Sequence, residues 1–148
     1  MKIQSQVHIN GTKEAVWQVI TNIDEAEKTI SAIEEIEVLE RPDAGFVGLK
    51  WRETRTMFGR SATEIMWITD AVENEYYQTR AENHGSIYIS RLQIEEQADG
   101  VELTMTFEGQ AQTMIAKIMS VIPGFLFKSA TEKAVHQDLK DIKALVEK

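Results

Sequence analysis

Cysteine is absent from the 148-residue chain, and histidine is rare, with His8, His84 and His136 only. The missing cysteines exclude disulfides, a thiol nucleophile and a cysteine-bound metal. No two histidines stand at the short spacing that is typical of metal ligands, so we expect no metal site. The sequence also lacks a nucleophile-elbow motif and a glycine-rich phosphate loop, and we therefore expect no cofactor.

The chain also lacks an excess of basic residues and a long apolar run. Its net charge of −8 repels phosphate backbones, which argues against a nucleic-acid partner. No stretch approaches the roughly 18 apolar residues of a transmembrane segment, and residues 1–11 contain no signal-peptide core. The 43% of apolar residues is typical of a globular protein. We therefore expect one cytoplasmic domain over residues 1–148.

The first part of the sequence predicts a strand, short helices and a second strand. Apolar and polar residues alternate from Ile3 to Ile9, as in a strand with one buried face. Thr12 is a suitable helix N-cap for the apolar residues that follow it at helical spacing. We expect another turn or two of helix over 25–30 and a strand over 33–41.

Glycine-containing turns divide the middle of the chain into antiparallel strands. Asp99-Gly100 is a strong hairpin signal, and a turn centred there sets Ile94 opposite Met105. Strands over 76–82 and 86–95 pair in the same way around 83–85. The strands between residues 33 and 110 are therefore expected to form an antiparallel meander.

Three charged residues fall on the apolar face of another predicted hairpin. Glu53 and Arg55 share a face with Trp51, and a turn at Gly59-Arg60 sets Glu64 opposite Arg55. Isolated buried charges are costly, so these groups should pair with one another. Three interpretations remain open. The charges form a salt bridge that only supports the sheet, a polar anchor for a ligand, or a catalytic site in which Glu53 or Glu64 is a general acid or base.

The C-terminal part predicts a long amphipathic helix over 126–148. Charged residues, Asp138 among them, are expected on its other faces. The apolar stripe consists of Val135, Leu139, Ile142 and Val146.

The segment before this helix, 115–127, is apolar almost all round and contains the break Pro123-Gly124. Such a segment is core packed on the sheet, a lid over a cavity, or an exposed patch for a membrane surface or a second copy of the chain. The last interpretation would allow the chain to form a homodimer.

This order of elements predicts an α+β domain in which one long helix lies across a curved antiparallel sheet. With these features the chain resembles the START-like (SRPBCC) superfamily, in its polyketide cyclase/dehydrase-type branch. The matching residues are Glu14-Ala15-Val16-Trp17 after the first strand, the segment Gly48–Arg55, and the ending Asp138–Glu147.

The resemblance implies a helix-grip fold, in which a curved seven-stranded sheet wraps around the C-terminal helix, with two short helices after the first strand. It also implies an apolar cavity that binds a small hydrophobic or amphipathic molecule, such as a lipid, polyketide or isoprenoid-like compound. It carries over no catalytic residue. An enzyme of the polyketide cyclase or dehydratase type, using Glu53 or Glu64, and a protein-interaction module are the alternatives.

Bulky apolar residues with this spacing are typical of an ordinary core as well as of a ligand cavity. On the predicted hairpin, Met66 is expected inside, while Trp67 stacks on Arg52 across the strands. The candidate cavity residues are Trp51, Glu53, Arg55, Glu64, Met66, Tyr77, Tyr88, Leu92, Met105, Phe107, Ile115, Met119 and Phe127.

Overall fold

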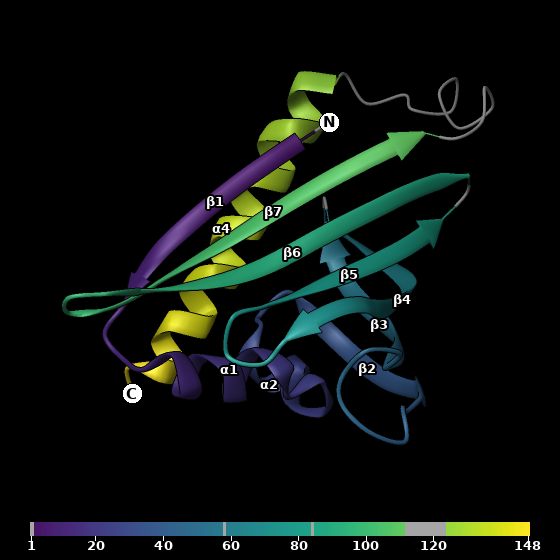
Figure 1. Cartoon of the computed structure of the whole chain (residues 1–148). Coiled ribbons are helices and arrows are strands. Elements are labelled where there is room, and N and C mark those ends of the chain that lie inside the picture. The colour runs from purple at the N-terminus through teal and green to yellow at the C-terminus, as the bar shows by residue number, and fades with distance from the viewer. Residues whose placement is uncertain (1, 58, 84, 112–123) are drawn as a thin grey trace.

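The computed structural model of the chain describes residues 2–57, 59–83, 85–111 and 124–148 (Figure 1). The helical elements are α1 (Lys13–Thr21), the 3-10 turn η1 (Ile23–Glu25), α2 (Ala26–Thr29) and α4 (Gly124–Val146). The strands are β1 (Lys2–Ile9), β2 (Ile33–Glu40), β3 (Lys50–Met57), β4 (Arg60–Val72), β5 (Tyr76–Asn83), β6 (Ser86–Gln97) and β7 (Gly100–Ala111).

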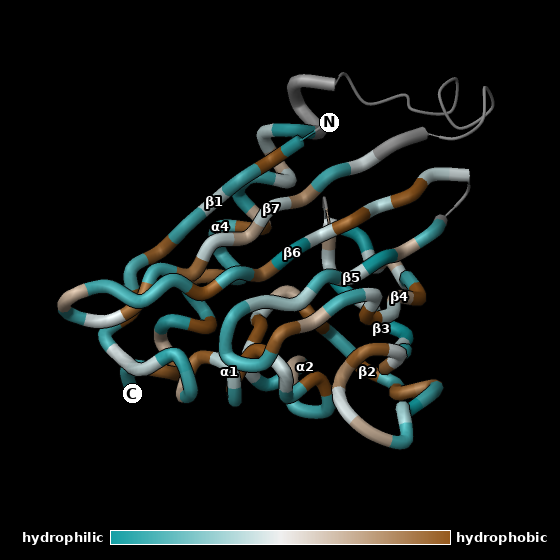
Figure 2. Tube along the Cα trace, viewed as in Figure 1, coloured by the Kyte–Doolittle hydropathy of each residue, from teal (hydrophilic) through white to brown (hydrophobic). Residues whose placement is uncertain are grey.

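The strands form one seven-stranded antiparallel sheet in the order β1-β7-β6-β5-β4-β3-β2. The sheet curves around α4, which contacts β1, β7, α1 and α2 (Figure 1). Apolar and polar residues alternate along the strands, so one sheet face packs inward (Figure 2). The predicted helix-grip arrangement is confirmed.

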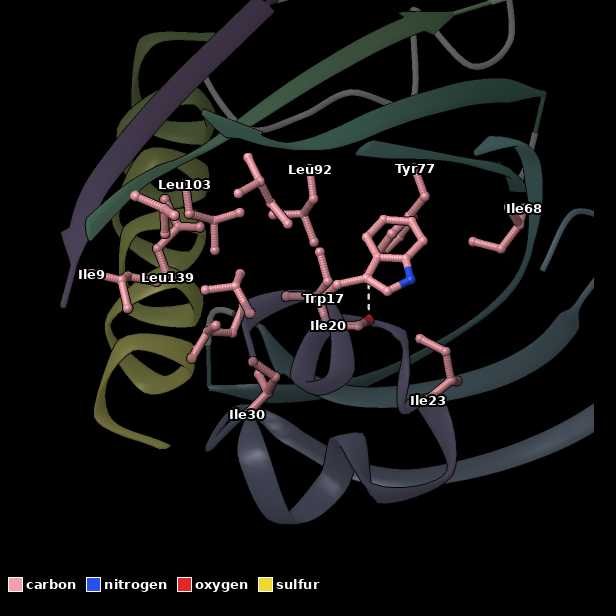
Figure 3. Close-up of a cluster of buried hydrophobic side chains, with 14 of the residues drawn as sticks. Ile9, Trp17, Ile20, Ile23, Ile30, Ile68, Tyr77, Leu92, Leu103 and Leu139 are labelled. Atoms are coloured by element: carbon pink, nitrogen blue, oxygen red, sulfur yellow. Dashed lines mark hydrogen bonds between the residues drawn. The ribbon is translucent and has the colours of Figure 1, made fainter. Parts of the chain in front are cut away.

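The first helix begins where the sequence predicts. The Thr12 Oγ1 accepts a hydrogen bond of 3.1 Å from the Ala15 N–H, which satisfies one of the free donors of the first turn. Val16, Trp17 and Ile20 then bury one side of α1. Figure 3 shows this side of α1 facing β-strand residues and Leu139 of α4 across the core.

The β3–β4 hairpin differs from the prediction by two residues in register. Met57 pairs with Arg60, so the residue opposite Glu64 is Glu53 and not Arg55. The turn lies one residue earlier than expected. Moving a turn by one residue changes each cross-strand pair by two, so the same side chains still share a face.

The same shift changes the partner of Trp67. Trp67 pairs with Lys50, whose Nζ lies 5.9 Å from the centre of the Trp67 ring. The predicted stacking of Trp67 on Arg52 is therefore wrong. Arg52 is ion-paired with Glu37 of β2 instead.

The β6–β7 hairpin shows the same displacement. Gln97 pairs with Gly100, and Ile94 lies opposite Leu103 rather than Met105. Gly100 has a φ of +148°, and a Cβ at this position would lie 2.3 Å from the Ile9 carbonyl oxygen of β1. Glycine is needed here because β1 passes very close, and not because Gly100 is the centre of the turn.

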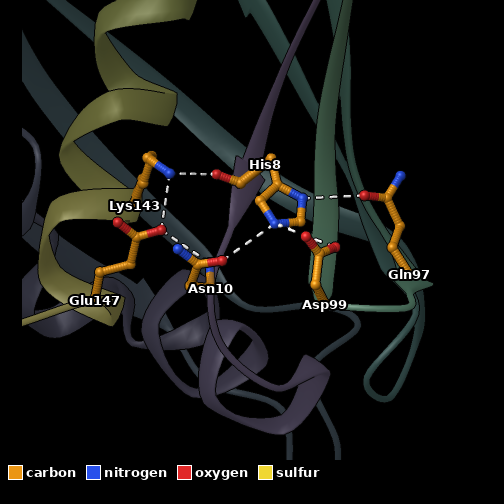
Figure 4. Close-up of polar contacts among 6 residues, drawn as sticks. All are labelled: His8, Asn10, Gln97, Asp99, Lys143 and Glu147. Atoms are coloured by element: carbon orange, nitrogen blue, oxygen red, sulfur yellow. Dashed lines mark hydrogen bonds and ion pairs between the residues drawn. The ribbon is translucent and has the colours of Figure 1, made fainter.

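The C-terminal end of α4 is fixed to the end of β1. The Lys143 ammonium donates to the His8 carbonyl and pairs with Glu147, which accepts a 2.8 Å hydrogen bond from the Asn10 N–H (Figure 4). The His8 ring extends this network toward the β6–β7 hairpin, with its Nδ1 3.0 Å from the Gln97 Oε1. These contacts hold α4 across the sheet.

The side chains of Val135, Leu139 and Ile142 are buried, as the stripe predicts. The helix begins at Gly124, directly after Pro123. None of the helices described over 2–57, 59–83, 85–111 and 124–148 is long and apolar enough to cross a membrane.

Candidate functional site

A cavity of about 810 Å³ lies between the inner face of the sheet, the α1–α2 segment and α4. This volume lies within the ~300–1,000 Å³ that is typical of small-molecule sites. The strands β3 to β7 supply much of the wall through alternate residues, since side chains of one parity share a face. From α4, the cavity is lined by Thr131, Ala134, Val135, Asp138 and Ile142.

Most of the wall is apolar and several of its side chains are adaptable. Met66 and Met105 contribute flexible thioethers from β4 and β7. Tyr88 stacks on Phe107, with 5.6 Å between ring centres and 23° between ring planes. Flat apolar surfaces of this kind favour a ligand with an extended apolar body.

The structure places ten of the thirteen candidate residues on this one wall, through the alternation of the strands. Ile115 and Met119 lie outside the described residues. Phe127 belongs to α4, but its side chain lies outside the description too. The alternatives for the 115–127 segment thus remain expectations. The ten are Trp51, Glu53, Arg55, Glu64, Met66, Tyr77, Tyr88, Leu92, Met105 and Phe107.

Three charged side chains meet at the wall. The Arg55 Nε donates to the Glu53 Oε2 at 3.0 Å, and its Nη2 donates to the Asp138 Oδ2 at 3.1 Å. The other Glu53 oxygen accepts a 3.3 Å hydrogen bond from the Trp51 Nε1. The side chains of Glu53 and Asp138 are each 10% exposed and that of Arg55 is 20% exposed, so the pairs are largely withdrawn from water.

Asp138 is the least satisfied member of this cluster. Burial raises the pKa of its carboxyl to about 6, although the neighbouring Arg55 opposes the shift. Its Oδ1 is buried and has no hydrogen-bond partner among the described residues. Buried carboxylate oxygens are rarely left unpaired, which makes this oxygen a place where a ligand donor would be favourable.

Asp138 is also the residue that the sequence analysis missed, because the charged residues of the helix were assigned to its outer faces. The spacing of Asp138 from its helical neighbours could have placed it on the cavity side. Thr131, Val135, Asp138 and Ile142 follow one another by four, three and four residues, which places them on one helical face. The predicted pairing of Arg55 with Glu53 is confirmed, and the structure adds Asp138 as a second partner. Glu64 lies opposite Glu53 on the cavity wall.

Tyr77 forms a fixed part of the wall. Its hydroxyl donates a 3.1 Å hydrogen bond to the Ile20 carbonyl of α1, and its ring meets Trp17 edge-on at 6.2 Å. Burial raises the pKa of the Tyr77 hydroxyl far above its usual range, so the group stays protonated. Tyr77 therefore joins β5 to α1 beside the cavity and is not suited to acid–base chemistry.

Among the residues that the structure describes, no three metal-binding side chains come together. The charged cluster on the cavity wall contains two carboxylates, but an arginine lies between them, and its positive charge disfavours a cation at that point.

A curved antiparallel sheet that encloses a cavity against its C-terminal helix defines the helix-grip class of START-like proteins. The chain belongs to the family described as "Polyketide cyclase / dehydrase and lipid transport", whose profile matches residues 1–147. The comparison with curated proteins found no significant sequence match.

Solved structures share the fold at low sequence identity. A START superfamily protein from Mycobacterium smegmatis has a TM-score of 0.82 at 15% identity, over 99% of this chain and 97% of that one. The Zhui aromatase/cyclase from Streptomyces sp. R1128 has a TM-score of 0.79 at 14% identity, over 99% and 93%. The di-domain ARO/CYC StfQ from the steffimycin biosynthetic pathway has a TM-score of 0.81 at 10% identity, over 99% and 50%.

Proposed function

We propose that this protein binds a small hydrophobic or amphipathic molecule in the cavity between the sheet and α4. The observation that carries the proposal is the cavity itself, which has a volume of about 810 Å³ in a chain of only 148 residues. Protein interiors are normally close-packed, and a void of this size leaves many side chains without packing partners. A bound apolar molecule would restore those contacts.

The distribution of polar groups supports an oriented ligand. The apolar wall suits the body of the ligand, while the charged cluster of Glu53, Arg55 and Asp138 offers polar contacts at one place. A few polar groups within a mainly apolar pocket are what fixes ligand orientation in small-molecule sites.

Native mass spectrometry of freshly purified protein tests this proposal. We expect a defined additional mass that disappears when the protein is denatured, since a ligand held by burial is lost with the fold. Extraction and analysis of that species would give its chemical class. A preparation that stays ligand-free, and that also fails to bind an apolar fluorescent probe such as 1-hydroxypyrene, would contradict the proposal.

A cavity-filling variant locates the binding. Ser90 lies on β6 and lines the cavity, so Ser90→Phe adds bulk to the wall without adding charge. Gln93→Phe on the same strand is the matched control, because residues of opposite parity face the other side of the sheet. We expect Ser90→Phe to reduce probe binding at least about tenfold, which corresponds to ~1.4 kcal/mol. The control variant should bind as the unmodified protein does.

The state of Asp138 favours an enzyme of the cyclase or dehydratase type as a second candidate. A carboxyl with a pKa of about 6 at a cavity wall suits general acid–base catalysis near neutral pH. Asp138 fits this role better than Glu53, since both Glu53 oxygens already accept hydrogen bonds from Trp51 and Arg55.

Catalysis can be separated from binding with the molecule that co-purifies with the Asp138→Asn variant, which would not yet have been converted. Incubating it with excess protein should convert it to a product that has lost water if the protein is a dehydratase or a dehydrating cyclase. The Asp138→Asn variant should then bind the molecule without converting it. A molecule that is recovered unchanged from both proteins would support binding alone.

A further inference from the structure

We infer that the cavity selects ligands whose buried polar end is an uncharged hydroxyl that donates a hydrogen bond to Asp138, and that it rejects ligands with a carboxylate or phosphate at that end. This inference rests on the proposed binding function. It is carried by the hydrogen bonds, burial and charges of the cluster of Glu53, Arg55 and Asp138.

The hydrogen-bond donors of Arg55 are already used by carboxylates of the protein. Arg55 is the cation of the cluster, and an anionic ligand would need its N–H groups. Two of them already serve carboxylates of the protein, the Nε at Glu53 and the Nη2 at Asp138. A ligand carboxylate would therefore have to compete with two charge-assisted hydrogen bonds, which are among the stronger ones in proteins.

The charged residues of the cavity wall carry a net negative charge. With Glu53 and Asp138 ionised, the cluster carries one positive and two negative charges. Two further charged residues line the cavity, Glu64 and Arg60, and their charges cancel in sum. The lining thus keeps an excess of one negative charge. Repulsion between like charges is strong where water is largely excluded, so an anionic end is disfavoured.

Within the part of the chain that the structure describes, Asp138 also offers an unpaired hydrogen-bond acceptor. The Asp138 Oδ1 has no hydrogen-bond partner among the described residues, although Asp138 is only 7% exposed and lines the cavity. Rotation about the terminal torsion of an aspartate is soft, so a partial turn can bring the buried Oδ1 toward a ligand in the cavity. A hydroxyl supplies the missing donor, whereas an ether or an ester supplies none.

Three pyrene probes with the same apolar body test this inference. 1-Hydroxypyrene donates a hydrogen bond, 1-methoxypyrene is neutral without a donor, and pyrene-1-carboxylate is anionic at about pH 7.5. We expect the hydroxyl compound to bind the full-length protein at least about tenfold more tightly than either of the others, measured by fluorescence titration. Ser90→Phe should weaken the binding of all three, which places them in the cavity.

Two charge variants complete the test. Asp138→Asn removes the excess negative charge and keeps the side-chain volume, so it should reduce the preference for hydroxyl over carboxylate by at least about tenfold. Glu132→Gln on the exposed side of α4 changes the net charge of the protein equally and should leave the preference unchanged.

The outcomes separate this inference from the proposed function. Equal or tighter binding of the carboxylate, or equal binding of the methyl ether, would overturn the inference while cavity binding stands. An equal effect of Glu132→Gln would also overturn it, since the preference would then come from the overall charge. Failure of all three probes to bind would contradict the proposed function, and the inference would fall with it.

Discussion

At the scale of single residues, the buried charges on the cavity wall set the chemistry of the protein. Arg55 neutralises only one of the two carboxylates that it contacts, Glu53 and Asp138. Removing one partner of a buried ion pair commonly costs ~3–5 kcal/mol because an uncompensated charge stays behind. The cluster is thus less suited to adding stability than to holding a polar group in an apolar cavity.

The raised pKa of Asp138 predicts a pH-dependent contribution to stability. An acid whose pKa is about 6 when folded and ~3.9 when unfolded binds protons preferentially in the folded state. The stabilisation is full below the unfolded value and is lost as the pH rises through the folded value. Between about pH 4 and pH 7, the free energy of unfolding of the protein should fall by roughly 2 kcal/mol relative to that of Asp138→Asn.

Urea titrations at a series of pH values measure this difference. The Glu132→Gln variant is the control and should show a difference that does not change over the same range. If the unmodified protein instead gains stability over Asp138→Asn as the pH rises, attraction by Arg55 outweighs burial, and the pKa of Asp138 is lowered in the fold.

At the scale of the elements, close approaches between strands determine which glycines matter. Gly59 lies in the β3–β4 turn and Gly100 directly follows the β6–β7 turn, and both have positive φ, at +73° and +148°. Their surroundings differ. A Cβ at Gly59 would meet nothing within 4 Å, whereas at Gly100 it would overlap the Ile9 carbonyl. The same substitution therefore has two different costs.

We predict that Gly100→Ala destabilises the protein clearly more than Gly59→Ala does. Gly59→Ala should cost only the ~1–2 kcal/mol of placing a non-glycine residue in this region of backbone space. Gly100→Ala should add the cost of moving β1 away from β7. Chemical denaturation of both variants measures the two values. Equal losses would mean that β1 adjusts freely at Ile9, and the requirement for glycine at position 100 would come from the backbone alone.

At the scale of the whole molecule, the fold combines a packed region with an open one. The side chains of Leu103, Leu139 and Ile9 are fully buried where α4 crosses the sheet. The cavity lies beside them, against the same helix and the same sheet. Stability and ligand occupancy are therefore coupled, since a molecule that binds only the folded state stabilises it by mass action.

We predict that 1-hydroxypyrene raises the melting temperature of the protein. At about 100 times its Kd, the ligand should add ~2.7 kcal/mol, which is roughly 5–11 °C for a chain of this size. Calorimetry measures the shift, as does differential scanning fluorimetry read at a wavelength where the pyrene probe does not emit. Ser90→Phe should show little shift and Gln93→Phe the full one. Equal shifts in both variants would place the probe outside the cavity.

The alternation of apolar and polar residues in strands, and their spacing in helices, allowed much of the fold to be predicted from the sequence alone. The N-cap at Thr12, the apolar face of α1 and the stripe of α4 can be read from residue spacing within one element, and all three were predicted. The faces of β3 to β7 were predicted as well, since a shift of two residues in register keeps each side chain on its face. Ten candidate residues thus reached the cavity wall despite wrong cross-strand pairs.

Only the tertiary structure decided the register of the hairpins and the second partner of Arg55, which is Asp138. Gly100 is placed by its contact with β1, which lies more than ninety residues earlier in the chain, and no local turn preference contains that contact. Asp138 meets Arg55 because α4 packs against the sheet in a position that brings this residue close to β3. Helical spacing places a carboxyl on a face, but the charge that it meets there depends on how the helix and the sheet pack.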